Sequence, residues 1–232
     1  MATLSGSNAQ VWIVGATGLV GANLLNDLLD HPSVAGVTAL VRRPIDHQHP
    51  KLRVEVLNFD RLEASLTGQT ATHVFCCLGT TIGAAGSQEA FRRVDYDYPL
   101  ALGRAAKASN AGRFLVISAM GANSTSRIFY NRVKGDMERD LAALALPALD
   151  VFRPSLLLGK RSDKRTGERL AALLAAPMNA LLLGPLRKYR PIEAADVARA
   201  MIAIAFDASP PTGPVVVHES DRIAAIARTK AR

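Results

Sequence analysis

Tyr130 and Lys134, in the segment YNRVKGDMERDL, have the types and the spacing that proton transfer requires. They are four residues apart in a pattern that predicts a helix over 130–144, which puts both side chains on one helix face. A phenol with a pKa of about 10 is a weak acid and a weak base at neutral pH, but an adjacent ammonium group lowers that pKa. The pair therefore predicts general acid–base chemistry, although the same spacing also occurs on helix faces that carry no site.

A serine precedes this tyrosine by twelve residues. Ser118 follows the apolar run FLVI, where its hydroxyl can donate a hydrogen bond to the oxygen of a carbonyl substrate and hold it near the phenol. Together with Tyr130 and Lys134, a serine in this place predicts an active site that reduces a carbonyl group.

The segment VWIVGATGLVG places three glycines directly after an expected strand. Gly15 permits a tight turn, Gly18 lets the backbone approach a pyrophosphate, and Gly21 lets the next helix pack close to the strand. The unpaired N–H groups at a helix start also attract anions. The motif therefore predicts a dinucleotide site, and a merely tight turn is the less favoured interpretation. The contacts expected in this turn are Gly15, Thr17, Gly18, Leu19, Val20 and Gly21.

The end of the second expected strand indicates which dinucleotide is bound. Sites that prefer NAD carry an acidic residue there, which binds the ribose hydroxyls. This chain has Arg42 and Arg43 instead, and guanidinium groups pair well with a 2′-phosphate. We therefore expect NADP(H) as the cofactor, with a solvated arginine pair as the alternative.

The expected cofactor also bears on the catalytic pair, because a cationic nicotinamide lowers the pKa of a nearby phenol such as Tyr130.

Two other strand ends supply further candidates for the dinucleotide site. Asp60, after the third strand, can accept a hydrogen bond from the adenine amino group. After the fourth strand, Gly79 lets the backbone approach the ribose. The cofactor contacts expected in this segment are Cys77, Leu78, Gly79 and Thr80.

Apolar runs rich in valine, isoleucine and phenylalanine alternate with helical patterns along the chain. The expected strands cover 11–14, 37–41, 52–57, 73–78, 113–117, 149–152 and 214–217. The expected helices cover 19–30, 88–109, 130–144, 167–183 and 194–206, with a basic surface helix over 219–232. This alternation predicts an α/β fold of the Rossmann type, a doubly wound, mainly parallel sheet with helices on both faces.

The length of 232 residues, 49% of them hydrophobic, suits one sizeable core. We expect a flexible tail over 1–9 and a single NAD(P)-binding domain over 10–232, with a substrate-side segment around 155–192. The chain has no apolar run long enough to cross a membrane, and its first residues lack the charged-then-apolar order of a secretion signal. A cytoplasmic location is therefore expected.

Neither a metal site nor a disulfide is expected. His47 and His49 are two residues apart in a proline-flanked loop, with no third ligand nearby in the sequence. Cys76 and Cys77 are adjacent on an expected strand, so their side chains point to opposite faces.

The positive charge is concentrated in one segment. Eight lysines and arginines within 160–190 face only Asp163 and Glu168, so this segment supplies six of the eight net positive charges. A local excess, one tryptophan and no recognisable nucleic-acid motif disfavour a nucleic-acid partner. Because ligands of open α/β sheets bind at the carboxyl edge, we expect a mobile lid over a small-molecule substrate of anionic or amphipathic character. A solvated basic surface is the alternative.

Residues 10–206 resemble the atypical short-chain dehydrogenases/reductases. The segments CCLGTTIGAAG, RVDYDYPL, YNRVKG and VFRPSLLLG are similar to those of the branch of Tat-interacting oxidoreductases. This resemblance implies a Rossmann fold, NADPH binding and a catalytic set of Ser118, Tyr130 and Lys134. Many members carry a second serine directly after the one that matches Ser118, whereas this chain has Ala119, so Ser124 and Ser126 are alternatives for the serine.

The resemblance adds three residues to consider. It implies that the loop after the sixth strand lies against the nicotinamide, which makes Pro154 and Ser155 expected cofactor contacts. Better-known short-chain enzymes often carry an asparagine in the helix after the fourth strand, and the nearest match here is Asp95.

The favoured interpretation is an NADP-dependent oxidoreductase that reduces a carbonyl-type small molecule, with Tyr130 as proton donor. The alternative is an NADP(H)-binding regulatory or redox-sensing protein with little turnover. The presence of both Tyr130 and Lys134 favours the enzyme, because a pure binding module has no need of that pair. The pair also holds the nicotinamide ribose, so Lys134 is an expected cofactor contact too and a binding protein stays open as the alternative.

Overall fold

The computed structural model describes residues 9–159, 184–206 and 213–229. Its main sheet has seven parallel strands in the order β3-β2-β1-β4-β5-β6-β9. The strands are β1 (Ala9–Val14), β2 (Val34–Val41), β3 (Leu52–Val56), β4 (His73–Cys76), β5 (Arg113–Ile117), β6 (Leu149–Arg153) and β9 (Val215–Glu219). A small second sheet pairs β7 (Leu157–Leu158) with β8 (Ile192–Glu193). The order reverses between β1 and β4, which is where sheets of this kind bind ligands.

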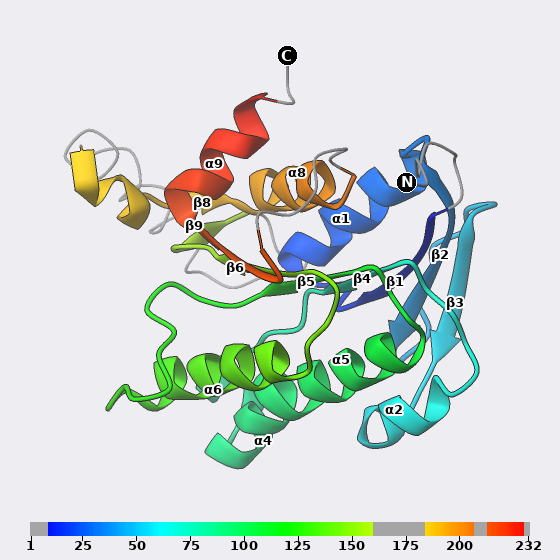
Figure 1. Cartoon of the computed structure of the whole chain (residues 1–232), viewed down its shortest axis with the longest axis horizontal. Helices are drawn as coiled ribbons and strands as arrows, with labels where there is room; N and C mark the ends of the chain where they lie inside the picture. The colour runs from blue at the N-terminus through cyan, green and yellow to red at the C-terminus, as the bar shows by residue number, and fades with distance from the viewer. Residues whose placement is uncertain (1–8, 160–183, 207–212, 230–232) are drawn as a thin grey trace.

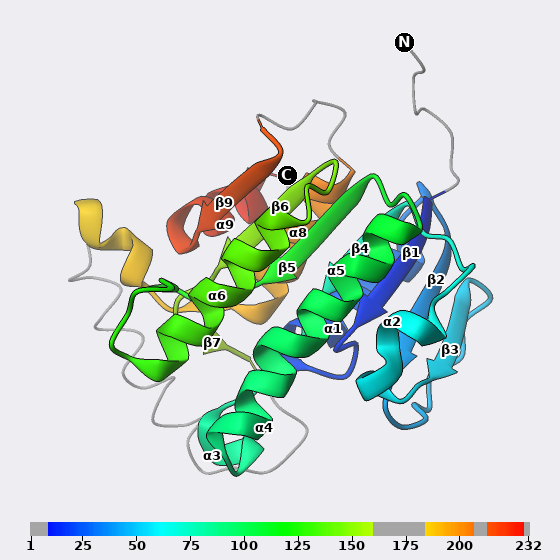
Figure 2. The same cartoon turned by 60° about the horizontal axis from the view of Figure 1, so that its bottom comes forward.

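Helices cover both faces of the main sheet (Figures 1 and 2). One face carries α1 (Leu19–Asp30), α8 (Ala194–Ala205) and α9 (Ser220–Thr229). The other carries α2 (Leu62–Ser65), α4 (Gln88–Arg92), α5 (Tyr98–Ala108) and α6 (Phe129–Ala143). A short α3 (Ile82–Ala85), a π-helical turn (Arg93–Asp97) and two 3₁₀ helices (Phe59–Arg61 and Gly184–Tyr189) complete the described elements. The α/β Rossmann-type fold expected from the sequence is confirmed.

The core has two halves because successive residues of a buried strand face opposite sides of the sheet. In β1, Val11 and Ile13 pack with α1 and α8, whereas Trp12 and Val14 pack with α2 and α5. Both sets are almost fully buried, which explains why the strand sequences show so little polar alternation.

Several boundaries differ from the expectation. Ala9, assigned to the tail, already pairs in β1. The helix expected over 88–109 contains the π-helical turn between α4 and α5. At the C-terminal side, α9 is not only a surface helix, because Ile223 and Ala227 are buried against the core. The helix expected over 167–183 lies outside the described residues.

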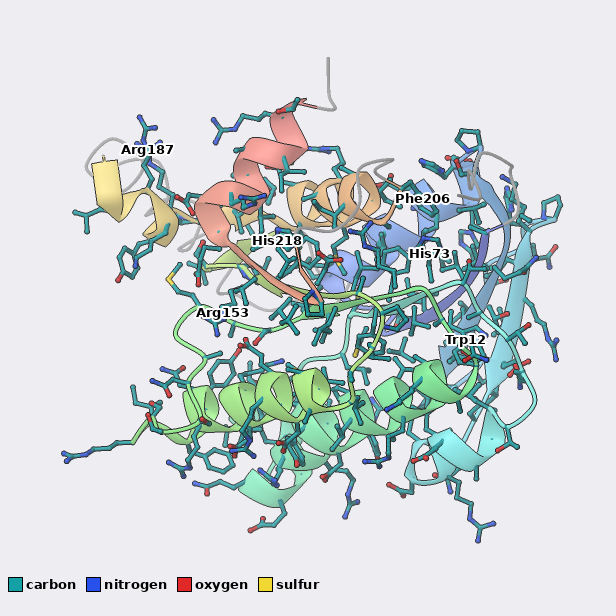
Figure 3. All side chains as sticks on the ribbon, viewed as in Figure 1. Trp12, His73, Arg153, Arg187, Phe206 and His218 are labelled. Carbon is teal, nitrogen blue, oxygen red and sulfur yellow. The ribbon has the colours of Figure 1, made fainter. Side chains whose placement is uncertain are left out.

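A buried chain of polar groups joins the last three strands of the sheet. Asp150 in β6 accepts from Arg113 Nε of β5 at 2.8 Å and lies 2.8 Å from His218 Nε2 of β9. The Arg113 guanidinium also donates to the carbonyl oxygen of Ala205, at the end of α8, at 3.5 Å. The His218 ring stacks on Phe152 with centroids 4.8 Å apart, so it lies on the face of the sheet that α8 and α9 cover (Figure 3). The polar chain therefore links β5, β6, β9 and α8.

Three further findings concern the described residues alone. Within them, no helix combines the length and apolar character needed to span a bilayer. They also contain no group of three or more histidine, cysteine or acidic side chains that could hold a metal ion. Cys76 and Cys77 are both free thiols.

Candidate active site

The turn between β1 and α1 requires glycine at two positions. Gly15 has φ of +77°, and a Cβ atom there would lie 2.4 Å from the carbonyl oxygen of Cys77. A Cβ atom at Gly21 would lie 2.0 Å from the carbonyl oxygen of Gly15. Both distances are far below van der Waals contact, so a side chain at either position would push β1, α1 and the end of β4 apart.

The start of α1 is suited to an anion. Gly18 is its N-cap residue, no side chain of the described residues caps it, and its first turn contains no acidic residue. The first N–H groups of this 12-residue helix therefore keep their positive partial charge. Of the other predicted contacts, Thr17 is exposed, Leu19 is half-buried and Val20 is buried in the core. Val20 can thus contribute only its backbone.

The predicted adenine end lies at the carboxyl ends of β2 and β3. Arg42 and Arg43 directly follow β2 and are exposed. Asp60 already accepts a hydrogen bond from the Tyr98 hydroxyl, at 2.9 Å. Burial is the main cause that raises the pKa of Tyr98, Asp60 raises it further, and the nearby Arg42 lowers it. Arg42, Asp60 and Tyr98 therefore form one cluster, and Tyr98 is a member that the sequence did not indicate.

The segment after β4 runs between the glycine turn and a buried carboxylate. Cys77 N donates to Val14 O at 3.0 Å, and Thr80 N donates to Asp95 Oδ2 at 3.0 Å. Leu78 packs on the core face that includes α5. A Cβ atom at Gly79 would meet only Asp95 Oδ1, at 3.7 Å, so this position tolerates a small side chain.

Lys134 and Asp95 form a buried ion pair beside the predicted proton donor. Lys134 Nζ lies 2.7 Å from Asp95 Oδ1, and the two side chains are 3% and 0% exposed. Lys134 Nζ also lies 3.5 Å from the carbonyl oxygen of Ile117, at the end of β5. Burial opposes charge on Lys134, but Asp95 and then Tyr130 favour it, and its pKa is raised. The ammonium group is therefore retained at neutral pH.

Tyr130 lies one helical turn before Lys134, and its ring packs against Phe91 with centroids 5.4 Å apart. Its pKa is raised, not lowered: burial is the largest cause, Lys134 lowers the pKa, and Asp95 raises it. The expectation of a lowered phenol pKa is thus wrong for the protein alone, because it ignored burial and the carboxylate behind the lysine. At neutral pH the phenol is protonated.

Ser118 occupies the predicted strand end, but its hydroxyl is engaged. It is 4% exposed and donates to Glu138 Oε1, on α6. A serine hydroxyl has one proton to donate, so in this arrangement Ser118 has none left for a substrate carbonyl. The alternative Ser126 accepts from Ile128 N at 3.2 Å, and Ser124 lines a cavity together with Glu138 and Arg153.

The loop after β6 is held from two sides. The carbonyl oxygen of Pro154 accepts from Met120 N at 3.2 Å. The Ser155 hydroxyl donates to the carbonyl oxygen of Arg190 and accepts from Ser220 Oγ at 3.0 Å. Both predicted contacts therefore lie in a well-connected segment at the carboxyl edge of the sheet.

Three residues of the site, Asp95, Glu138 and Gly135, were not predicted from the sequence to have a function. Asp95 was noted only as a departure from an asparagine, and Glu138 was not singled out although it lies four residues after Lys134 on the same helix face. A Cβ atom at Gly135 would lie 2.2 Å from the backbone of Asn123 and Ser124. The glycine therefore lets the loop after β5 lie directly on α6.

Two cavities flank this region. One of about 400 Å³ lies against α6 and β9 and is lined partly by Glu138 and Arg153. The other, of about 730 Å³, lies between α9, β8 and the 3₁₀ helix and is lined partly by Arg187 and Arg190. Figure 3 shows Arg187 at the rim of the molecule, away from the glycine turn. The five other basic residues of the predicted lid, at 160–169, lie outside the described residues.

Known proteins resemble this chain in sequence. The sequence pattern of the NAD(P)H-binding family matches residues 15–157. Protein HTATIP2 of Rattus norvegicus is 37% identical over 168 residues, which cover 71% of this chain and 69% of that protein. Protein FMP52, mitochondrial, of Coccidioides immitis is 30% identical over 219 residues, 89% of each chain.

The names of these relatives correct one expectation. FMP52 proteins of several fungi, at 30% to 38% identity, are named mitochondrial. The cytoplasmic location expected from the sequence is contradicted by these names and does not stand. A sequence without a recognisable secretion signal or membrane span can still be imported into mitochondria, so these features do not indicate a cytoplasmic location.

Solved structures share the fold. MoeE5 in complex with UDP-glucose and NAD has a TM-score of 0.67 and 17% identity, covering 95% of this chain and 81% of that one. A UDP-galactose 4-epimerase has a TM-score of 0.66 and 12% identity, covering 90% and 75%. At such low identity the likeness shows a common fold alone.

The family match covers more than half of the chain and includes the glycine turn, Asp95, Tyr130 and Lys134. The relatives share at least 30% of their residues with it over most of its length. The fold is the one that this family's NAD(P)-binding domains have. The chain therefore belongs to the atypical short-chain dehydrogenases/reductases, in the branch that contains HTATIP2.

Proposed function

We propose that this chain is an NADP(H)-dependent oxidoreductase that reduces a carbonyl group on a small molecule. The observation that carries the proposal is the buried Asp95–Lys134 pair beside Tyr130, at the carboxyl edge of a dinucleotide-binding sheet. A buried ion pair costs desolvation free energy and is a poor way to gain stability. Placed next to a titratable phenol, it gives that phenol a defined charge environment.

The structure fits a dinucleotide at the glycine turn. Side chains are excluded at Gly15 and Gly21, and the uncapped start of α1 offers N–H groups to a pyrophosphate. When bound, the reduced nicotinamide supplies a hydride to the carbonyl carbon. The exposed Arg42 and Arg43 support a preference for the 2′-phosphate of NADP(H).

The protein's own part of the reaction is proton transfer. Tyr130, protonated at neutral pH, donates its hydroxyl proton to the carbonyl oxygen as the carbon accepts the hydride. The Lys134 ammonium group stabilises the phenolate that remains, and Asp95 holds that ammonium in place. The raised pKa of the phenol suits the direction of reduction, because the acid form is the one present.

The proposal is tested with a panel of carbonyl compounds and NADPH. For any compound that is reduced, Tyr130→Phe lowers kcat about 100-fold to 10,000-fold, the usual contribution of a general acid. The same variant binds NADPH as the parent does, because the hydroxyl acts in the transition state. A rate within a few-fold of the parent removes Tyr130 from the mechanism.

Calorimetry separates the two cofactors. The parent binds NADPH more tightly than NADH at fixed salt, and the double variant Arg42→Ala, Arg43→Ala loses this preference, since charge-assisted hydrogen bonds contribute about 1.5 to 3 kcal/mol each. Equal affinities in the parent contradict the NADP(H) assignment. If NADPH binds tightly while the whole panel is inert, a cofactor-binding regulator is the better function.

A further inference from the structure

Glu138 is a buried carboxylate that collects hydrogen bonds from two strand ends. It lies on α6, one turn after Lys134 and two turns after Tyr130, and it is 9% exposed. Its Oε1 accepts from the Ser118 hydroxyl and from Arg153 Nε, the latter at 3.0 Å. Its Oε2 accepts from Arg153 Nη2. One carboxylate thus joins α6 to the ends of β5 and β6.

Arg153 extends this connection to the last strand. Its Nη1 lies 3.2 Å from Glu219 Oε1, at the end of β9. Figure 3 shows Arg153 between the sheet and α6. The next residue, Pro154, accepts from Met120 N, so the segments that leave β5 and β6 are bonded to each other as well as to α6.

The three polar residues spaced along this face of α6, Tyr130, Lys134 and Glu138, therefore have different partners. Tyr130 is left for the substrate, Lys134 binds Asp95 below the end of β4, and Glu138 binds the ends of β5 and β6. Because α6 is a continuous helix of 15 residues, the Glu138 contacts fix how far the segment after β6 lies from Tyr130. This segment is at the carboxyl edge, where the sheet binds its ligand.

We propose that Glu138 is a positioning residue for the nicotinamide half of the cofactor. Through Arg153 it sets the place of residues 153–155 relative to Tyr130 and Lys134, and Ser118 serves as a ligand of Glu138, not as the hydroxyl that binds the substrate carbonyl. The inference rests on the proposed function, because it says which residues hold 153–155 in place relative to Tyr130 and Lys134 in that same active site. The adenine half, at the ends of β2 and β3, does not depend on it.

The test compares two ligands on the same variant. NADPH contains the nicotinamide, whereas 2′-phospho-ADP-ribose has the adenine, the 2′-phosphate and the pyrophosphate without it. We expect Glu138→Gln to weaken NADPH binding by about tenfold or more, a usual size for coupling between neighbouring groups. Binding of 2′-phospho-ADP-ribose stays within about twofold of the parent. Isothermal titration calorimetry measures both affinities.

Glu63→Gln is the matched control. It also removes one carboxylate from an arginine, since Arg104 Nε lies 2.6 Å from Glu63 Oε2, but both side chains are about half exposed. We expect it to leave the affinities for both ligands unchanged. If Glu138→Gln does not fold, Arg153→Lys takes its place. Lysine keeps the positive charge but cannot make the two hydrogen bonds of the guanidinium group to Glu138. We expect this variant also to weaken NADPH binding and not 2′-phospho-ADP-ribose binding, by a smaller factor.

Ser118→Ala distinguishes the two roles of the serine. As a ligand of Glu138, Ser118 can be removed with only a few-fold loss of kcat, and adding Ser118→Ala to Glu138→Gln costs nothing more. As a carbonyl-binding donor, its removal costs about 100-fold to 1,000-fold.

Each contrary result has a distinct meaning. If Glu138→Gln weakens both ligands equally, or neither, Glu138 has no selective role and the inference is wrong. A 100-fold loss in Ser118→Ala overturns the role given to the serine. If the parent binds neither ligand, it is the proposed function that is wrong, and not the selective role of Glu138.

Discussion

At the scale of single residues, the proposed chemistry depends on the balance of two opposite charges near one phenol, Tyr130. Lys134 lowers the pKa of Tyr130 and Asp95 raises it, while burial makes the largest contribution and raises it. The acidity of Tyr130 is therefore not set by the lysine alone. Removal of Lys134 and removal of Asp95 are therefore expected to shift the pKa of Tyr130 in opposite directions.

Replacement of Lys134 and of Asp95 is predicted to shift the pH profile in opposite directions. In the proposed reaction the phenol must be protonated, so kcat/KM is expected to decline as the pH rises through the pKa of Tyr130. Lys134→Gln removes the influence that lowers this pKa and moves the decline to higher pH. Asp95→Asn removes an influence that raises it and moves the decline to lower pH.

Profiles of kcat/KM over pH for the parent and both variants check this prediction. Asp95→Asn is the conservative choice because the amide keeps the shape of the carboxylate. Shifts of the two variants in the same direction contradict the assignment of opposite influences. Titration of the phenolate absorbance, with Tyr130→Phe as the blank, reports the same pKa without turnover.

At the scale of elements, the contact between α6 and the loop after β5 determines where Tyr130 lies. Gly135→Ala would place a methyl group 2.2 Å from backbone atoms of Asn123 and Ser124. We expect a loss of about 1 to 3 kcal/mol in the free energy of unfolding, typical of overpacking, in spite of the better helix propensity of alanine. Turnover falls as well, because the loop and the helix are forced apart.

Gly83→Ala is the matched control for this substitution. Gly83 lies in the short α3, and a Cβ atom there meets no atom within 4 Å. Its free energy of unfolding stays equal or rises by about 0.5 to 1 kcal/mol, the usual gain for alanine over glycine in a helix. Urea unfolding of the parent and both variants gives the comparison; equal midpoints for all three contradict the proposed contact.

The elements show which features the sequence could predict. The strands, the glycine turn and α6 follow from local patterns, since apolar runs, glycine spacing and a helical period extend over a few residues. The π-helical turn at Arg93–Asp97 does not follow from local patterns. Within it, Asp95 is turned inward to Lys134, which lies 39 residues further along the chain. Similarly, Ser118 was correctly located at a strand end, but its partner Glu138 is known only from the packing of α6 on the sheet.

At the scale of the whole molecule, the amino-terminal ends of the strands lie opposite the site, and one of them carries a half-buried histidine. His73 begins β4, and its Nε2 lies 3.2 Å from the carbonyl oxygen of Ala205, at the end of α8. Burial lowers its pKa most, the bond to Ala205 raises it, and Arg113 lowers it further. His73 thus resists protonation in the folded protein.

Acid is therefore predicted to destabilise the fold through His73. The unfolded chain takes up a proton at this histidine below its ordinary pKa of about 6.5, and the folded chain does so only at lower pH. Because the unfolded state binds more protons in this window, stability falls as the pH decreases from about 6.5 through the folded pKa. His73→Gln, which can still donate to Ala205, reduces this loss.

Urea unfolding at pH 7.5 and at pH 5.5, for the parent and the variant, measures the effect. His47→Gln, an exposed histidine in the loop after β2, is the control and leaves the difference between the two pH values as in the parent. If His73→Gln loses as much stability between pH 7.5 and pH 5.5 as the parent does, His73 is excluded as a source of acid sensitivity.

The polar chain through Arg113, Asp150 and His218 has a consequence for biosynthesis. On the ribosome, β5, β6 and α8 are made before β9, so a nascent chain can pair Asp150 with Arg113 while His218 does not yet exist. Glu219, the second acidic partner of Arg153, is likewise still missing. During that interval β6 is the open edge of a parallel sheet, with unpaired backbone groups of the kind that chaperones and other nascent chains bind. Once residues 215–219 have left the ribosome, they cover this edge as β9 and bring His218 to Asp150 and Glu219 to Arg153 in one step.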